Sequence, residues 1–117
     1  MKHKMKLQPE YFNYMLKGTK RIEIRLNDEK RKQIKIGDTI RFFKEPDLKE
    51  FFDTRVIDLL KYNSFDEMVD ELGMEILADK NMTKEELINA LEVFYTKEKQ
   101  KELGVIGIMI EHLHVGG

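Results

Sequence analysis

The alternation of apolar and polar positions predicts two strands and a helix in the first part of the chain. Residues 4–7 form a short extended run, and residues 22–26 alternate strictly between apolar and charged side chains. A period of two is the pattern of a half-buried strand. Between the two runs, Pro9 suits the first turn of a helix and Gly18 suits its left-handed end. We therefore expect a strand, a helix and a second strand.

Three more strands are expected, over residues 39–43, 51–60 and 105–110. Gly37 and Asp38 mark the entry into the first of these strands, and the second is rich in β-branched and aromatic residues, which favour extended structure. The last is apolar on both faces, as a strand in the interior of a sheet is. Gly107 within this strand indicates a bulge or a close backbone approach.

Two helices are expected between the last two strands. Ser64 with Glu67, and Thr83 with Glu86, have the spacing of capping boxes, and Gly73 ends the first of these helices. The second helix carries apolar residues at the i, i+3, i+4, i+7 spacing of one buried face: Leu87, Ala90, Leu91 and Phe94.

The order of elements predicts an α+β fold in which few connections are long enough for parallel crossovers. We expect a small, mostly antiparallel sheet that closes into a β-barrel, with helices packed on its outside, because closure removes exposed edges. No repeat, low-complexity tract or linker interrupts the sequence, so residues 1–117 are expected to form a single domain.

The composition excludes several classes of protein. The 117 residues are 41% apolar and contain no cysteine, which excludes disulfide scaffolds, thiolate metal sites and cysteine nucleophiles. No apolar run approaches the roughly 18 residues of a membrane span, and no secretory signal is visible. We expect a soluble, cytoplasmic protein. Without a phosphate-cradling Gly-rich loop, use of ATP or GTP is not indicated, and no cofactor is expected.

The charge is distributed unevenly along the chain. Residues 1–45 carry 13 Lys and Arg against 6 Asp and Glu, a charge of +7, whereas residues 46–117 carry 8 against 16, a charge of −8. A basic half indicates an anionic partner such as a nucleic acid. Alternatively, the two halves attract each other within the fold.

The segment 18–25 concentrates the residues that can carry chemistry. Lys20 lies at the start of a predicted strand, and Glu23 and Arg25 share one face of it, with Cα atoms roughly 6.5–7 Å apart. Such a trio can grip a phosphate or the edge of a base, and either Glu23 or a desolvated Lys20 can serve as a general base. The alternative is a solvated strand face whose ion pair contributes little.

The sequence of this segment, Gly18-x-Lys20-x-x-Glu23-x-Arg25, resembles the G-x-K-x-x-E-x-R signature of the ASCH domain family. The likeness continues through residues 27–31, 36–42, 95–98 and 103–108. It implies a PUA-like β-barrel with a cleft lined by Lys20, Glu23 and Arg25. It also implies that the ligand is RNA or a modified nucleoside.

One bacterial branch of the family removes the acetyl group of N4-acetylcytidine with a Lys, a Thr three positions later, and a Glu before an Asn-Met-Thr helix start. Lys20 and residues 81–83 match this pattern, but Glu23 stands at the Thr position and Lys80 at the Glu position. Asp79, next to Lys80, is a candidate substitute for the missing Glu. These departures speak against that particular activity.

Three functions are therefore considered. The first is an RNA- or nucleotide-binding module that uses Lys20, Arg21, Glu23, Arg25, Lys30, Arg31 and Lys32. The second is a small hydrolase of an amide or phosphodiester in a nucleoside or RNA, an amidohydrolase or a ribonuclease, with Lys20 and Glu23 as the catalytic residues. The third is a protein-interaction domain that uses the acidic helices within residues 64–94.

Two weaker candidates lie elsewhere. His112 and His114 are two residues apart, and His3 is a third possible ligand of a zinc ion, but a frayed chain end is the simpler interpretation and no metal is expected. Tyr95 is able to stack on a base, or else fills the core.

Overall fold

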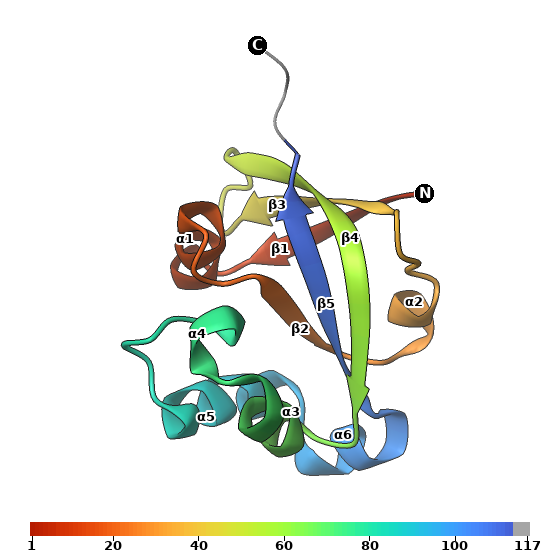
Figure 1. The fold of residues 1–117 in the computed structure, drawn as a ribbon, viewed down its shortest axis with the longest axis vertical. Helices are drawn as coiled ribbons and strands as arrows, with labels where there is room; N and C mark the ends of the chain where they lie inside the picture. Colours follow the sequence, from red (N-terminus) through yellow and green to blue (C-terminus); the bar gives the residue numbers. More distant parts are fainter. Residues whose placement is uncertain (114–117) are drawn as a thin grey trace.

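A five-stranded curled sheet forms the centre of the molecule (Figure 1). The computed structural model describes residues 1–113, and the strands lie in the order β1-β3-β4-β5-β2. The five predicted strands all form, with ends that differ by at most two residues from those predicted: β1 (Lys2–Leu7), β2 (Ile22–Leu26), β3 (Thr39–Lys44), β4 (Phe51–Tyr62) and β5 (Val105–His112).

The sheet is mixed. The pairs β3–β4, β4–β5 and β5–β2 are antiparallel, as expected, whereas β1 and β3 are parallel. A parallel pair needs a long crossover, and the chain between β1 and β3 supplies one because it forms a helix and the strand β2 before it returns. The fold is therefore α+β, with one parallel ladder in a mostly antiparallel sheet.

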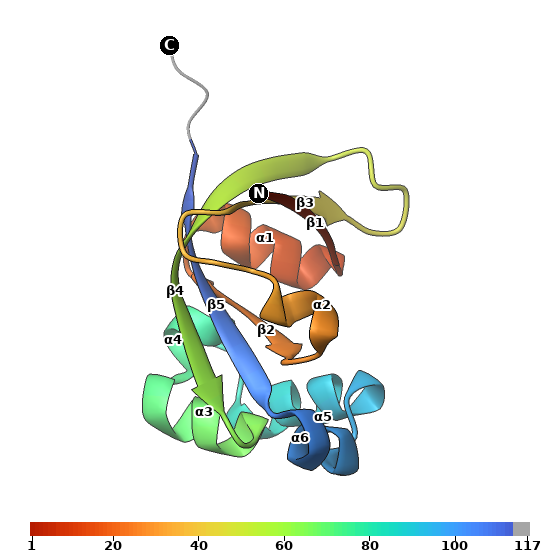
Figure 2. The same ribbon diagram turned by 90° about the vertical axis from the view of Figure 1, so that its right-hand side faces the viewer.

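The sheet does not close through backbone pairing, and the prediction of a closed barrel needs correction. In residues 1–113, β1 and β2 are the two ends of the strand order and form no ladder with each other. A side chain joins them instead: Nη2 of Arg25 donates a hydrogen bond to the carbonyl oxygen of Lys6, at 2.8 Å. The result is a half-barrel whose seam lies between β1 and β2 (Figure 2).

Three helices that the sequence predicts are present: α1 (Pro9–Lys17), α3 (Phe65–Leu72) and α5 (Lys84–Phe94). Three others were not predicted: α2 (Glu29–Lys32), α4 (Met74–Leu77) and α6 (Lys97–Leu103). Two of these are single turns, and α6 is polar except for Leu103, so no apolar period marks it. Helices α3 to α6 gather at one end of the sheet (Figure 1). No helix in the described range is long and apolar enough to cross a membrane.

Local signals fix the two helices that border the site. Gly18 ends α1 in the left-handed conformation, with a φ of 93°, so that the chain reverses directly into β2. At the start of α5, the Thr83 hydroxyl accepts from the Glu86 backbone N–H, and the Glu86 carboxylate accepts from the Thr83 N–H. The predicted box at Ser64 is only half formed, because Glu67 accepts from Asn63 instead.

Two apolar cores lie on opposite faces of the sheet. One fills the inside of the curl and includes Ile106, Ile108 and Ile110, and the other lies between the outer face and the helices and includes Val105. The strand β5 separates them, which explains why it is apolar on both faces. A Cβ on Gly107 would lie 3.0 Å from Cγ2 of Ile22 and 3.5 Å from Cε of Met68, so this glycine makes room for two side chains and not for the backbone approach that the sequence predicted.

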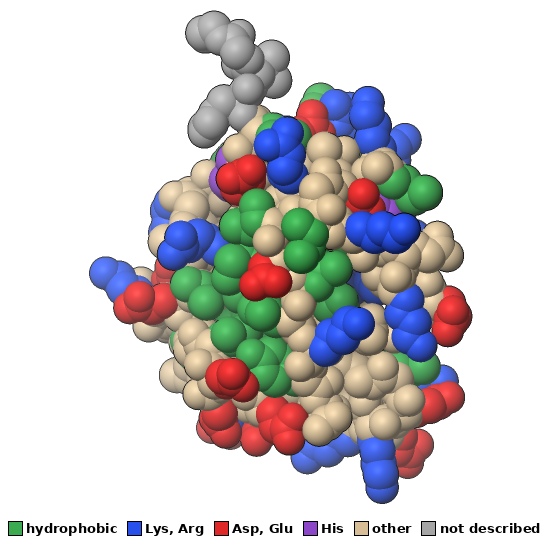
Figure 3. Space-filling view, turned by 45° about the vertical axis from the view of Figure 1, so that its right-hand side comes forward, with side chains coloured by type: hydrophobic (Ala, Val, Ile, Leu, Met, Phe, Trp, Pro, Cys, Tyr) green, Lys and Arg blue, Asp and Glu red, His purple; other side chains and the backbone are tan. Residues whose placement is uncertain are grey.

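Part of the sheet surface is left without a covering helix. Ile57 of β4, at an irregularity in the pairing with β5, is 41% exposed. Figure 3 shows a contiguous apolar area on one side of the molecule, with Lys and Arg side chains to its right. Apolar and basic surfaces therefore lie next to each other on this side.

Candidate functional site

A cleft of about 270 Å³ opens between the end of β1, the start of α1, strand β2 and helix α5. Its floor comes from the basic half of the chain and one wall from the acidic half. The residues that line it are Lys6, Leu7, Gln8, Tyr11, Lys20, Glu23, Ile24, Arg25, Glu45, Leu87, Ala90, Leu91, Phe94 and Tyr95.

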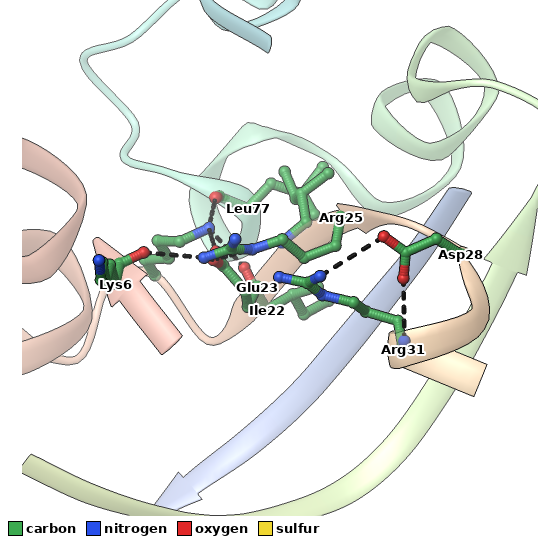
Figure 4. Close-up of polar contacts among 9 residues, drawn as sticks. Lys6, Ile22, Glu23, Arg25, Asp28, Arg31 and Leu77 are labelled. Atoms are coloured by element: carbon green, nitrogen blue, oxygen red, sulfur yellow. Dashed lines mark hydrogen bonds and ion pairs between the residues drawn. The ribbon is translucent and has the colours of Figure 1, made fainter. Parts of the chain in front are cut away.

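Lys20 is a buried cation at the floor of the cleft, only 2% exposed. Its ammonium donates to the carbonyl oxygen of Ile22 and, at 2.7 Å, to that of Leu77, and it lies 3.5 Å from Oε1 of Glu23 (Figure 4). Burial lowers the pKa of Lys20, and the Glu23 carboxylate opposes this shift. The three protons of the ammonium face three acceptors, so Lys20 is fixed in place.

Glu23 is 5% exposed and lies between two cations. Oε1 accepts from the backbone N–H of Ile24 at 3.1 Å, and Oε2 accepts from Nε of Arg25 at 2.9 Å. The Lys20 ammonium lies on its other side. The alternative of a solvated strand face is therefore wrong, because this carboxylate has been removed from bulk water and its charge is balanced by two neighbouring cations.

Arg25 joins the carboxylate to the seam of the half-barrel. Its side chain is 16% exposed, and Nη2 contacts both Oε2 of Glu23 and the carbonyl oxygen of Lys6, each at 2.8 Å. Burial alone would lower the pKa of Arg25, but the Glu23 carboxylate and Tyr95 outweigh it and raise the pKa. The structure thus brings Lys20, Glu23 and Arg25 together along one open cleft.

Apolar and aromatic side chains form the walls of the cleft. The predicted stripe on α5 runs from the buried Leu87, through Leu91, to Phe94, which is 63% exposed. Tyr11 of α1 also lines the cleft, and its ring lies 5.8 Å from the Lys20 ammonium. Tyr11 and Phe94 were not predicted as cleft residues from the sequence. For Phe94 a signal was available, because it is the last apolar residue of the predicted stripe on α5.

Tyr95 packs against the core and also lines the cleft. Its ring centroid lies 5.8 Å from that of Phe65, so it packs against the core between the sheet and the helices. A half-buried tyrosine of this kind offers a ligand an edge that the core holds in place.

A second hollow, of about 410 Å³, lies beside the cleft and shares Lys6 and Arg25 with it. Five basic side chains and three apolar ones line it, and no acidic side chain does: Lys4, Met5, Lys6, Arg25, Lys30, Arg31, Phe43 and Leu48. Lys30 and Arg31 are predicted nucleic-acid-binding residues. Lys4 and Lys6 were not predicted as binding residues. Their alternation along β1 indicates a basic face of that strand and could have revealed them.

Two other predicted binding residues lie away from both hollows. The backbone of Arg21 pairs with Ile76 and Ile110, and its side chain lines a separate surface hollow next to Ile57. Arg21 precedes the first residue of β2 and does not share the cleft face with Glu23. Lys32 is exposed, 3.4 Å from Glu29, and lines neither hollow.

The two described histidines of the suggested zinc site, His3 and His112, have separate partners. Nε2 of His3 lies 2.8 Å from Asp38, and Nε2 of His112 lies 2.8 Å from the carbonyl oxygen of Met15. His114 lies outside the described residues. Within residues 1–113, no group of three His, Asp or Glu side chains is placed to hold a metal ion.

A comparison with protein families decides the family of this fold. The model of the ASCH domain matches residues 5–114, nearly the whole chain. The chain belongs to the ASCH domain family. A search of curated proteins found no match to this ASCH chain.

Solved structures share the fold of this ASCH domain. The crystal structure of a hypothetical protein, PH0355, is 40% identical, covers 97% of this chain and 100% of its own, and superposes with a TM-score of 0.84. The solution structure of protein PF0455 from Pyrococcus furiosus is also 40% identical, with coverages of 97% and 99% and a TM-score of 0.77. A mutant of ZmASCH from Zymomonas mobilis is 10% identical, with coverages of 92% and 66% and a TM-score of 0.63, which shows the fold alone.

Of the residues that depart from the deacetylating branch of the ASCH family, Glu23 lines the cleft, whereas Lys80 and its neighbour Asp79 lie outside it. Lys80 is exposed, and Asp79 is 4% exposed, with Oδ2 accepting from the backbone N–H of Asn81 at 3.2 Å. Neither lines the cleft. Asp79 stabilises the turn before α5 and does not replace the missing carboxylate of that branch.

Proposed function

We propose that this ASCH domain binds RNA or a nucleotide and takes one base into the cleft. The observation that carries the proposal is the buried line of Lys20, Glu23 and Arg25 at the floor of an open cleft with apolar walls. A small number of placed polar groups within apolar surroundings is the usual composition of a ligand site.

The chemistry of the cleft suits a nucleobase. The Glu23 carboxylate accepts hydrogen bonds from an amino or imino group, and Arg25 donates to ring nitrogen or carbonyl oxygen. The rings of Tyr11 and Phe94 line the same cleft and offer flat apolar surface on which a base can stack. The polar floor would select the base, and the aromatic walls would supply affinity that depends little on sequence.

The distribution of charge supports an anionic partner. Among the ion pairs of the described residues, two join the basic and acidic halves of the chain, Arg41 with Asp53 and Lys44 with Glu50. Most of the positive charge of residues 1–45 is therefore not neutralised by the acidic half. This arrangement favours the first of the two interpretations that the sequence left open.

The proposal is tested by titrating the protein with a fluorescently labelled single-stranded RNA of random sequence at low salt. We expect binding that Glu23→Gln weakens by roughly 10-fold or more, as expected for the loss of a charged hydrogen bond. Lys32→Ala serves as the control because its side chain lies outside both hollows. The absence of RNA binding at low salt would contradict the proposal.

A second candidate function, hydrolysis of an amide or phosphodiester in a nucleoside or RNA, is favoured by one observation. Lys20, with its pKa lowered by burial, and the buried Glu23 carboxylate line the same cleft. A lysine whose pKa is lowered in this way, in a cleft and beside a specific charged partner, is typical of catalytic sites. In this role Glu23 would transfer the proton, and Lys20 would stabilise the negative charge that develops on the oxygen.

Incubation with a panel of acylated nucleosides and short RNAs tests this second function. We expect product from the wild-type protein and a loss of about 100-fold or more in Glu23→Gln, the scale of general acid–base catalysis. If no product forms, or if Glu23→Gln forms it at the same rate, hydrolysis is excluded for that panel while the binding function stands.

A further inference from the structure

We propose that the second hollow holds the nucleotide that follows the base in the cleft, so that the ligand is an RNA step of at least two nucleotides and not a free nucleoside. The proposal rests on the proposed function and adds the class of ligand to it. In this arrangement the linking phosphodiester lies over Arg25, which lines both hollows.

The composition of the second hollow points to a phosphate. Five of its eight lining side chains are basic and none is acidic. Two of these cations have a carboxylate partner within ion-pair distance in the described residues: Arg25 pairs with Glu23, and Arg31 lies 3.4 Å from Asp28. Within residues 1–113, Lys4, Lys6 and Lys30 contribute charge without such a partner. A concave surface of one sign of charge concentrates ligands of the opposite sign.

Arg31 carries an unused donor. Its side chain is 15% exposed, and its Nε is buried and has no hydrogen-bond partner within residues 1–113. The Asp28 side chain accepts from the backbone N–H of Arg31 and holds the short helix α2 in place. Figure 4 shows the Arg25 and Arg31 side chains extending in the same direction from β2 and α2. Two guanidinium groups that face one hollow suit the bidentate recognition of phosphate oxygens.

The volume of the second hollow and its apolar lining residues indicate a ligand larger than a phosphate. The hollow measures about 410 Å³, larger than the cleft of about 270 Å³. Phe43 and Leu48 line it together with the cations. An aromatic ring beside phosphate-binding cations is the usual arrangement where a single-stranded nucleic acid stacks its bases. The hollow therefore suits a phosphate together with the sugar and base attached to it.

The test compares ligands of increasing length by isothermal titration. The probes are the four ribonucleosides, their 3′- and 5′-monophosphates, and a pooled set of ribodinucleotides. We expect affinity to rise in that order, with the dinucleotides at least tenfold tighter than the nucleosides, because each step engages more of the second hollow. Equal affinity for nucleosides and dinucleotides would overturn the proposal.

Matched variants locate the effect. Lys30→Ala and Arg31→Gln should each weaken dinucleotide binding by about tenfold and leave nucleoside binding unchanged, since a charged hydrogen bond contributes roughly this factor. Lys32→Ala, two residues from Lys30 but outside the hollow, should change neither. With a single-stranded RNA as the ligand, the slope of log affinity against log salt in the double variant of Lys30 and Arg31 should fall by about 0.7 for each phosphate charge that the protein no longer neutralises.

The outcomes separate this proposal from the proposed function. If Glu23→Gln abolishes binding while the two variants of the second hollow have no effect, the base site stands and the second hollow is not used. If none of the probes binds, the proposed function fails with it. If Lys30→Ala weakens nucleosides and dinucleotides alike, the residue acts through folding, and the proposal is wrong.

Discussion

At the residue scale, the site depends on two charged side chains that the fold has removed from water. Lys20 and Glu23 are 2% and 5% exposed, and each balances the charge of the other. The desolvation of such a pair is offset only when further hydrogen bonds complete it. Here the carbonyl oxygens of Ile22 and Leu77 and the guanidinium of Arg25 complete it.

Removal of one member of the pair should therefore destabilise the protein. We expect Lys20→Met to lower the free energy of unfolding by about 3–5 kcal/mol, because it leaves the buried Glu23 carboxylate with only one of its two cations and removes the donor to two buried carbonyl oxygens. Urea denaturation followed by circular dichroism measures this change. The double variant Lys20→Met with Glu23→Gln should recover part of the loss. An unchanged urea midpoint in the single variant would show that the pair does not contribute to stability.

At the scale of elements, the first strand is fixed at its start by a polar cluster. The Asp38 carboxylate lies 2.8 Å from Nε2 of His3 and 3.2 Å from the N-terminal ammonium, and it accepts from the backbone N–H of Lys35 at 3.0 Å. The hydrogen bond with His3 is the main cause of the lowered pKa of Asp38. The cluster thus links β1 to the turn before β3.

This cluster makes the stability of the fold depend on pH. A carboxyl group with a lowered pKa in the folded state stabilises the fold fully above its unfolded pKa of about 3.9, and the contribution decreases as the pH falls below that value. The difference in unfolding free energy between the wild type and Asp38→Asn should therefore shrink as the pH falls from about 4 to 2. Urea midpoints at each pH measure it. A difference that stays constant down to pH 2 would exclude this role of Asp38.

Strand β5 gives a second test at this scale. A methyl group at position 107 would lie 3.0 Å from Cγ2 of Ile22 and 3.5 Å from Cε of Met68, between the sheet and α3. We expect Gly107→Ala to lower the free energy of unfolding by about 1–3 kcal/mol through overpacking. Thermal unfolding measures this effect, and Gly107→Ala combined with Ile22→Ala, which removes the Cγ2 atom, should be less destabilised than the sum of the two single variants.

At the scale of the whole molecule, the half-barrel is closed by a side chain. Arg25 joins β2 to β1 where no backbone ladder is present in the described residues. The same residue lines the cleft and the second hollow. Closure of the fold and binding of a ligand therefore depend on one guanidinium group.

Loss of this link should loosen the first strand. We expect Arg25→Leu to speed the amide hydrogen exchange of β1 by roughly fivefold, since a net hydrogen bond contributes about 1 kcal/mol. Arg55→Leu is the matched control because Arg55 forms an exposed pair with Glu111 across β4 and β5. Equal exchange of β1 in the two variants would mean that the link at the seam does not hold the strand.

Some of the site could be predicted from the sequence, and the reasons are local. The spacing of Lys20, Glu23 and Arg25 along one strand follows from the two-residue period, and Gly18 fixes where that strand begins. Arg21 was predicted to bind the ligand but lies outside the cleft. Its position depends on backbone pairing with Ile76 and Ile110, which are distant in the sequence. The basic strand β1 was missed as a lining element for the same reason.

The sequence by itself determined the five strands, the capped helices and the family signature, because apolar periods and helix caps act between residues a few positions apart. Tertiary structure alone decided that the sheet stays open between β1 and β2, that Glu23 is buried, and that α5 faces the strand as the wall of a cleft. These features depend on contacts between distant segments, such as Lys20 with Leu77 and Arg25 with Lys6, and no local pattern encodes which segments will meet.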